Sequence, residues 1–336
     1  MKLNEQNYLK SIELLGEQIK QSYFEAGRLK LPASYRQINK IAVFGMGGSQ
    51  LGTDLINNLF SQELKVPIIQ IRDYSVPGFV DANTLVLLLS YSGTTEEVLA
   101  VSQKLSSRNK VVVITVGGKL SEVSKKNHWP MYQFDPRYNP SGQPRMGTGY
   151  LVGSVMAILK KLNLLAINDS TANQMIVGAK LTSAVKLQAK KLAKSLKGKT
   201  PIIIGAEHLF GNAHIMTNQI NESSKQRCYY FALPELNHHL LEGLSFPSTT
   251  KKNLVFVFLN SKNYFARNKK RFALTEQVVN KQGIGSVKID VGGNKVQEAI
   301  KLLGLGGLLS YELTKINKVE PDQIPWVNYF KEQLGK

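Results

Sequence analysis

The chain has 336 residues, of which 43% are hydrophobic and 20% charged, so it can bury the cores of two ordinary domains. Its formal net charge is +19 at pH 7, with the basic residues spread along the whole chain. No RNP, zinc-finger or helix-turn-helix signature accompanies them, so we expect no nucleic-acid partner. A positive charge of this kind suits the attraction of small anions to a cleft.

Membrane insertion and secretion are not expected either. The most apolar stretch, residues 150–167, is interrupted by Lys160 and Lys161, so it predicts a buried helix. The N-terminal residues mix charged and apolar side chains and contain no signal-peptide pattern. A single cysteine, Cys228, can form no internal disulfide, which fits a reducing compartment. We therefore expect a cytoplasmic protein with no membrane partner.

Short apolar runs alternate with helical patterns in the first half of the chain, which is typical of βαβ units. Strands are predicted at residues 41–45, 67–71, 84–90 and 111–116. Helices are predicted at residues 6–28, 50–60, 95–106 and 148–164. The pattern favours a parallel sheet covered by helices.

The second half of the chain repeats this alternation. Strands are predicted at residues 201–206, 228–233, 254–260 and 286–291. Helices are predicted near residues 211–225, 269–281, 296–316 and 324–334, with one basic helix face at 186–199. We therefore predict an α/β fold with two doubly wound parallel-sheet domains in tandem, residues 1–160 and 161–336.

A glycine-rich segment, GMGGSQLGTDLI (residues 45–56), follows the first predicted strand and opens a helix. It departs from the dinucleotide fingerprint because Gln50 stands where the third glycine is needed, and no Walker A lysine follows. Gly47 and Gly48 before Ser49 are more than a tight turn requires. They predict a loop whose backbone N–H groups approach an anion.

A hydroxyl-rich segment, SYSGTTEE (residues 90–97), follows the third predicted strand in the same way. A helix N-cap would explain one hydroxyl and one glutamate. Ser90, Ser92, Thr94 and Thr95 all carry hydroxyls, and a cap would leave the others without a ligand. A phosphate group could accept hydrogen bonds from all of them. Because parallel strands end at one edge of a sheet, we expect both segments to lie together there.

The two segments resemble the sugar isomerase (SIS) domain, whose Ser and Thr side chains hold the phosphate of a phosphosugar. Further blocks follow in the order RDYSVP (72–77), QPRMGTGYL (143–151), NESSK (221–225), PELNHH (234–239) and EPDQIPWVNYFKEQL (320–334). Together they resemble, over nearly the whole chain, the bifunctional phosphoglucose/phosphomannose isomerases. The resemblance implies two SIS domains. The first would contain the phosphate-binding loops, and the second would contain catalytic residues.

The resemblance also implies roles for individual residues. The phosphate ligands would be Ser49, Ser90, Ser92 and Thr95, with the backbone of Gly47 and Gly48. Glu222 would be the catalytic base, and Arg145 would lie beside C1 and C2 of the sugar. His238 and Lys331 would serve ring opening, although His239 remains an alternative to His238.

The chemistry of an aldose–ketose isomerisation calls for these residue types. One carboxylate, here Glu222, can move a proton between C2 and C1 through a cis-enediol. A fixed guanidinium, here Arg145, stabilises the negative charge that develops on the oxygens. An acid and a base, His238 and Lys331, are needed to open the sugar ring. This route requires no metal and no cofactor.

Several alternatives stay open at this point. The enzyme could act on glucose 6-phosphate alone, because the sequence does not reveal the room that mannose 6-phosphate would need around C2. A non-catalytic phosphosugar sensor would keep the phosphate ligands and dispense with Glu222 and Lys331. The resemblance further implies a homodimer in which the neighbouring subunit supplies the histidine.

Overall fold

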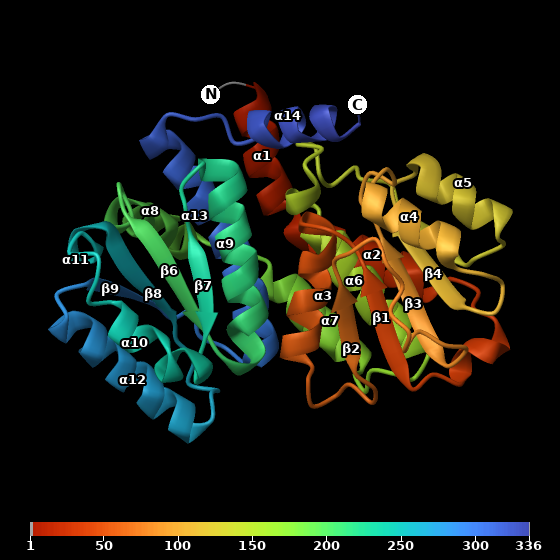
Figure 1. Cartoon of the computed structure of the whole chain (residues 1–336), viewed down its shortest axis with the longest axis horizontal. Helices are drawn as coiled ribbons and strands as arrows, with labels where there is room; N and C mark the ends of the chain where they lie inside the picture. Colours follow the sequence, from red (N-terminus) through yellow and green to blue (C-terminus); the bar gives the residue numbers. More distant parts are fainter. Residues whose placement is uncertain (1–2, 336) are drawn as a thin grey trace.

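The computed structural model describes residues 3–335, and its two parallel sheets lie on either side of a group of central helices (Figure 1). The first sheet has the order β2-β1-β3-β4-β5. Its strands are β1 (Lys40–Phe44), β2 (Ile68–Ile71), β3 (Thr84–Leu89), β4 (Lys110–Thr115) and β5 (Met131–Gln133). The four predicted strands are confirmed, whereas the three-residue β5 was not predicted.

Every residue of β3 and β4 is buried, which explains why both read as continuous apolar runs. The helices of this half are α1 (Leu3–Glu13), α2 (Leu15–Gly27), α3 (Gly48–Leu59), α4 (Glu96–Lys104), α5 (Gly118–Lys126) and α6 (Thr148–Lys161). Two short 3-10 helices are η1 (Ala33–Arg36) and η2 (Pro144–Met146).

The prediction of one helix at 6–28 is wrong, because the helix is interrupted at Leu14 (φ −89°, ψ 9°). The interruption lets α1 pack against α13 (Lys295–Asn317) while α2 packs against α6. Each segment thereby buries its own apolar stripe, which a single straight helix could not do against two partners.

The second sheet has the order β7-β6-β8-β9 and is also parallel. Its strands, all predicted, are β6 (Thr200–Gly205), β7 (Tyr229–Ala232), β8 (Leu254–Leu259) and β9 (Gly285–Ile289). Its other helices are α7 (Asp169–Gly178), α8 (Ser183–Ser195), α9 (Phe210–Ser224), α10 (Leu240–Gly243), α11 (Thr250–Asn253), α12 (Ala266–Lys281) and α14 (Pro325–Leu334). The 3-10 helices η3 (Glu207–Leu209) and η4 (Glu235–His238) complete this half.

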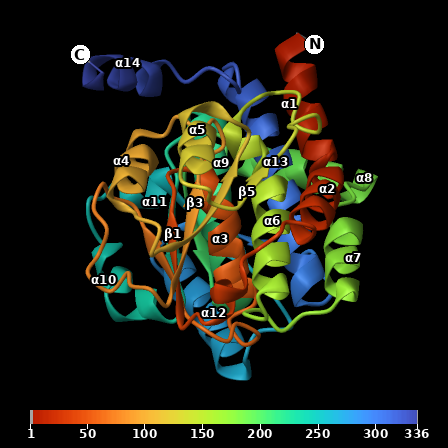
Figure 2. The same cartoon turned by 90° about the vertical axis from the view of Figure 1, so that its right-hand side faces the viewer.

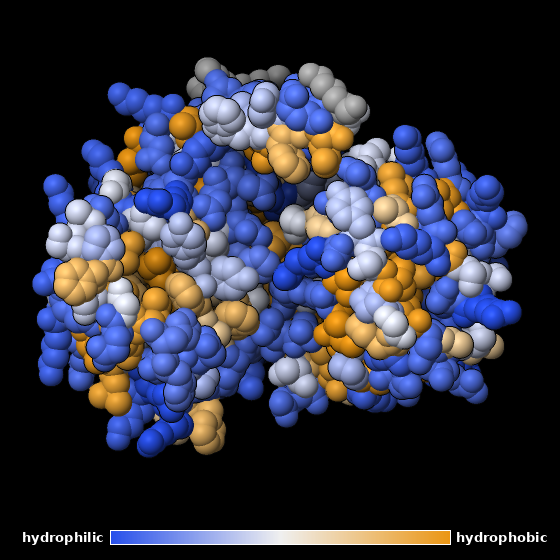
Figure 3. Space-filling model, viewed as in Figure 1, coloured by the Kyte–Doolittle hydropathy of each residue, from blue (hydrophilic) through white to orange (hydrophobic). Residues whose placement is uncertain are grey.

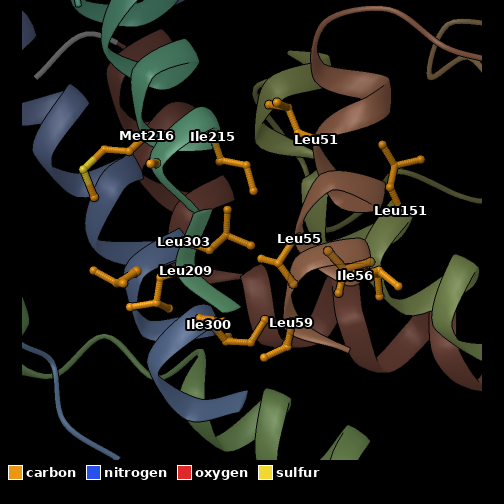
Figure 4. Packing of buried hydrophobic residues seen from close by; sticks show 14 of the residues in the cluster. Leu51, Leu55, Ile56, Leu59, Leu151, Leu209, Ile215, Met216, Ile300 and Leu303 are labelled. Carbon is orange, nitrogen blue, oxygen red and sulfur yellow. The ribbon is translucent and has the colours of Figure 1, made fainter. Parts of the chain in front are cut away.

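A shared apolar core joins the two domains where α3 meets α9 and α13 (Figure 4). Leu55 and Leu59, one helical turn apart on α3, lie among Ile215 of α9 and Ile300 of α13. Burying a side chain of this size contributes about 2 kcal/mol. The contact holds α3, and therefore the glycine-rich loop that opens it, against the second domain.

The C-terminal helix α14 differs from the rest because each of its residues is exposed. Figure 2 shows it projecting sideways from the body of the molecule. Among residues 3–335, no helix combines the length and the apolarity needed to cross a bilayer. The domain boundary predicted after residue 160 falls within the last turn of α6 and stays a prediction.

Candidate functional site

Two loops meet at the carboxyl edge of the first sheet, between the neighbouring strands β1 and β3. The chain leaves β1 toward α3 and leaves β3 toward α4, so the strand order changes direction at this point, as at the ligand sites of other doubly wound sheets. The backbone N–H of Tyr91 donates to Ser49 Oγ at 3.0 Å. The predicted meeting of the glycine-rich and hydroxyl-rich segments is therefore confirmed.

The hydroxyl-rich loop is held together by its own side chains. Ser90 Oγ lies 2.7 Å from Thr95 Oγ1 and accepts the Gly93 N–H at 3.0 Å. Ser92 Oγ lies 2.8 Å from Thr94 Oγ1. Thr95 occupies the N-cap position of α4, yet its side chain makes no capping hydrogen bond. The Thr95 hydroxyl pairs with Ser90 instead of capping the helix, so the N-cap alternative does not describe it.

The four predicted phosphate ligands differ in exposure. Ser90 is fully buried and Ser49 is 5% exposed, so both hydroxyls support the loops from within. Ser92 is exposed and Thr95 is half-buried. An anion arriving from solvent would meet Ser92 and Thr95 first, and the roles of all four as phosphate ligands stay predictions.

Arg145 lies directly behind the glycine-rich loop. A Cβ at Gly48 would lie only 2.9 Å from the backbone nitrogen of Arg145, so the loop can pack here only with a glycine. The guanidinium is buried and donates to Ser223 Oγ (3.1 Å), to Gln143 Oε1 (3.0 Å) and to the Pro321 carbonyl (2.5 Å). These contacts fix its plane in one orientation.

Glu222 approaches Arg145 from the other domain. It lies in the last turn of α9, and its Oε2 is 3.4 Å from Arg145 Nη1. The Glu222 side chain keeps 34% of its surface exposed, whereas that of Arg145 keeps 1%. A carboxylate that remains accessible therefore faces a rigid, buried cation beside the two loops.

A cluster of polar side chains, Asp54, Arg72 and His214, links α3 to α9 further from the site and fixes the position of one helix against the other. His214 Nδ1 of α9 lies 2.7 Å from Asp54 Oδ2 of α3, and Arg72 Nη2 lies 3.4 Å from the same oxygen. Arg72 also donates from Nε to Gln50 Oε1 at 2.7 Å. Residues from both domains thus set how the glycine-rich loop faces the end of α9.

Three further residues, which were not singled out from the sequence, surround the Arg145–Glu222 pair: Ser223 and Lys225 contact it directly, and Tyr8 contacts it through Ser223. The Tyr8 hydroxyl of α1 hydrogen bonds with Ser223 Oγ, the oxygen that also accepts from Arg145. Lys225 Nζ donates to the carbonyls of Glu222 (2.8 Å) and Ser223 (3.1 Å). Ser223 and Lys225 stand in the NESSK block, which offered a signal, whereas no motif marks Tyr8.

His238 lies far from this pair along the fold. Helix α9 ends before β7 begins, so Glu222 lies toward the amino edge of the second sheet. Strand β7 then carries the chain to the carboxyl edge, where His238 ends η4 as an exposed residue. Neighbouring His239 lies with Nε2 2.9 Å from Glu235 Oε2. One chain therefore does not bring His238 or His239 to Glu222.

Lys331 lies on the exposed helix α14, which follows the Pro321 segment that contacts Arg145. Figure 3 shows that this face of the molecule is hollowed between the two domains, below α14. Within residues 3–335, no three His, Cys, Asp or Glu side chains are grouped so as to hold a metal ion. The structure thus brings Arg145 and Glu222 together and places His238 at the opposite edge of the second sheet, while the role of Lys331 stays a prediction.

Comparisons with known proteins find relatives that are named as enzymes of sugar phosphates. The family model for the bacterial phospho-glucose isomerase C-terminal SIS domain matches residues 186–334. The bifunctional phosphoglucose/phosphomannose isomerase of Caldicellulosiruptor bescii is 29% identical, over 97% of this chain and 98% of that protein. The D-glucosamine-6-phosphate 4-epimerase of Sulfolobus acidocaldarius is 30% identical, over 67% of this chain and 70% of that protein.

Solved structures share the fold at lower identity. The C-terminal domain of glucosamine-fructose-6-phosphate aminotransferase from Francisella tularensis has a TM-score of 0.69 and 15% identity. The match covers 95% of this chain and 98% of that one. At such low identity the likeness shows the fold alone, and it agrees with the predicted α/β arrangement of two parallel sheets.

Proposed function

We propose that this chain, which belongs to the family of bifunctional phosphoglucose/phosphomannose isomerases, interconverts glucose 6-phosphate and mannose 6-phosphate with fructose 6-phosphate. The observation that carries the proposal is the contact of 3.4 Å between Glu222 Oε2 and Arg145 Nη1, directly beside the glycine-rich loop. A non-catalytic sensor needs only the phosphate loops, and it gives no reason for this pair.

The phosphate of the substrate would lie over the hydroxyl-rich loop and the start of α3. Ser92 and Thr95 would donate from their hydroxyls, and the N-termini of α3 and α4 favour an anion through their N–H groups. Ser90 and Ser49 would keep the two loops closed around it. Binding the end of the sugar that does not react fixes the position of C1 and C2.

Glu222 would act as the general base. Its carboxylate takes the proton from C2 of the open aldose, which leaves a cis-enediolate. A proton then passes from the C2 oxygen to the C1 oxygen, and the carboxylate returns its proton to C1 to give the ketose. Arg145 would stabilise the negative charge on the C1 and C2 oxygens without having to move. Mannose and glucose differ in configuration at C2, so one base can serve both when the substrate turns about C2–C3.

Ring opening would need a second chain. His238 lies at the opposite edge of the second sheet from Glu222, so we propose that the histidine comes from the other subunit of a homodimer. Lys331 would assist from α14. The proposal also includes a cytoplasmic location, which a single buried cysteine, Cys228, suits.

The test is to measure fructose 6-phosphate formation from glucose 6-phosphate and from mannose 6-phosphate separately, with EDTA present. Turnover of both sugars, lost in Glu222→Gln, supports the dual isomerase and its base. Turnover of glucose 6-phosphate alone restricts the activity to one sugar. Turnover of neither, with phosphosugars still raising the melting temperature, would favour the sensor and refute the catalytic roles.

Glucosamine 6-phosphate is the control substrate, because one relative is named a D-glucosamine-6-phosphate 4-epimerase. Epimerisation at C4 requires proton or hydride movement away from C1 and C2. A product changed at C4, without fructose 6-phosphate from the other two sugars, would replace the proposed reaction.

The shared site has its own test. Mixing inactive Glu222→Gln with inactive His238→Ala should form mixed dimers in which one of the two sites has both wild-type residues. Activity should therefore return after subunit exchange. Verified mixed dimers that remain inactive would show that His238 is not supplied across the interface.

A further inference from the structure

Lys225 ends helix α9 in a conformation that turns its side chain back over the site. Lys225 lies three residues after Glu222, and its backbone is in the left-handed region (φ 53°, ψ 28°). Its Nζ donates to the carbonyls of Glu222 and Ser223 at 2.8 and 3.1 Å. These are among the last carbonyls of the helix, which have no partner within it.

The same ammonium group reaches the segment that leads to α14. Lys225 Nζ lies 3.4 Å from the Pro321 carbonyl, which also accepts the Arg145 Nη2 hydrogen bond at 2.5 Å. Two cations from different domains therefore share one acceptor. The Pro321 carbonyl is therefore one of three acceptors, with Ser223 Oγ and Gln143 Oε1, that keep the guanidinium plane aimed at Glu222.

The charge of Lys225 is kept at this position against an electrostatic penalty. Partial burial of the ammonium group, followed by repulsion from Arg145, lowers the pKa of Lys225 to about 8, although Asp322 and Glu222 oppose the shift. Below that pH the folded protein holds a cation that the unfolded chain holds more easily, so this charge does not serve stability. A residue retained only as a helix cap would not need to lie beside Arg145.

We propose that Lys225 is a positioning residue of the isomerase, which holds the Pro321 carbonyl and thereby keeps the Arg145 guanidinium aligned with Glu222. The inference rests on the proposed function and deepens it. Loss of the ammonium proton of Lys225 would disturb the alignment of Arg145 with Glu222. Activity should accordingly decline on the alkaline side as Lys225 becomes neutral, while the phosphate loops keep binding the substrate.

The experiment compares Lys225→Met, Lys225→Arg and wild type between pH 6 and pH 10 with fructose 6-phosphate as substrate. Lys225→Met should lower kcat by about tenfold to a hundredfold at pH 7, as expected for a misaligned catalytic group, with KM changed by less than about threefold. Lys225→Arg should restore kcat and move the alkaline decline to higher pH, because a guanidinium keeps its proton.

Lys318→Met is the matched control. Lys318 follows α13 in the same left-handed conformation (φ 56°, ψ 44°), so its loss tests what removing a lysine from this kind of helix end does by itself. We expect its pH profile to follow that of wild type. Thermal unfolding of all variants shows whether they fold.

An unchanged kcat in Lys225→Met would overturn the inference, and so would an alkaline decline that stays near pH 8 in Lys225→Arg. Equal losses in Lys225→Met and Lys318→Met would also overturn it, because a helix cap would then suffice as the explanation. A wild type that isomerises no sugar phosphate would instead refute the proposed function, which keeps the two failures distinct.

Discussion

At the carboxyl edge of the first sheet the chain leaves β1 through Gly47 (φ 48°), and at the same edge of the second sheet it leaves β6 through Glu207 (φ 44°). In each sheet the strand order changes direction between two neighbouring strands, β1 and β3 in the first sheet and β6 and β8 in the second. The first edge gathers hydroxyls around an accessible surface. The second is closed by a carboxylate of its own, that of Glu298.

Glu298 lies on α13 and is fully buried. Its Oε2 accepts the Ser261 hydroxyl at 2.6 Å and lies 2.9 Å from His208 Nε2. Burial would raise the pKa of Glu298, but the hydrogen bonds from His208 and Ser261 outweigh it and hold this pKa below its usual value. An internal anion thus occupies the edge that in the first domain is proposed to receive a phosphate. Equal topology does not imply equal ligands.

The largest expected effect separates the carboxylates of the two regions. Glu222→Gln removes the proposed base while keeping its shape, so kcat should fall by about a thousandfold. Isomerase assays would measure this, with Glu298→Gln as the matched carboxylate-to-amide change. A loss of similar size in folded Glu298→Gln would break the comparison, because the second edge would then also take part in catalysis.

The next effect concerns the backbone of the first edge. Gly93 has φ 71°, and a Cβ there would lie 1.7 Å from the Gly117 carbonyl oxygen. Gly93→Ala should therefore displace the hydroxyl-rich loop and raise KM by about a hundredfold, since a 1 Å misplacement already has large effects. Titration with fructose 6-phosphate, followed by melting temperature, would detect the lost binding. Unchanged binding would mean that the loop does not hold the phosphate.

A stability effect should appear at the second edge. Glu298→Gln leaves His208 and Ser261 facing an amide in a buried site, so the free energy of unfolding should fall by about 3 kcal/mol. Because the folded-state pKa of Glu298 is depressed, its contribution is present above the unfolded pKa and is lost as pH falls through the folded one. Urea unfolding of wild type and variant at pH 7 and in acid should show the difference shrinking in acid.

The smallest effect is expected when Glu207, which follows β6, is replaced by glycine, the residue type that follows β1 at position 47. Glu207→Gly would relieve a left-handed backbone but remove acceptors for the Phe265 N–H and the Asn268 amide. These opposing changes should alter the free energy of unfolding by less than about 1 kcal/mol. Isomerase activity should stay the same, and any gain of phosphate binding at the second edge would contradict its closure.

The sheets could be predicted from the sequence mainly through their central strands, because β3 and β8 are buried almost throughout and read as uninterrupted apolar runs. Helix α5 was missed, since GKLSEVSKK is short, polar and opened by glycine. Helix α7 was missed for a similar reason, because DSTANQMIVG carries only a weak apolar stripe.

The site was predictable where short motifs carry it and not where tertiary contacts do. Ser49, the hydroxyl-rich loop, Arg145 and Glu222 each stand in a recognisable block. The hydrogen bond between Tyr8 and Ser223 joins residues 215 positions apart, which no local pattern can reveal. The internal anion at Glu298 was likewise invisible, because a helical glutamate usually lies in solvent.

The exposed helix α14 carries a natural fluorescent reporter of anything that comes to cover it. The chain has two tryptophans, of which Trp129 is 6% exposed in the first domain and Trp326 is 82% exposed on α14. Iodide should quench Trp326 emission and spare that of Trp129. A second subunit that covers α14, or a bound sugar phosphate that draws Lys331 inward, would reduce the quenching of Trp326 by iodide. The change could be measured from the fluorescence of this one tryptophan, without any label.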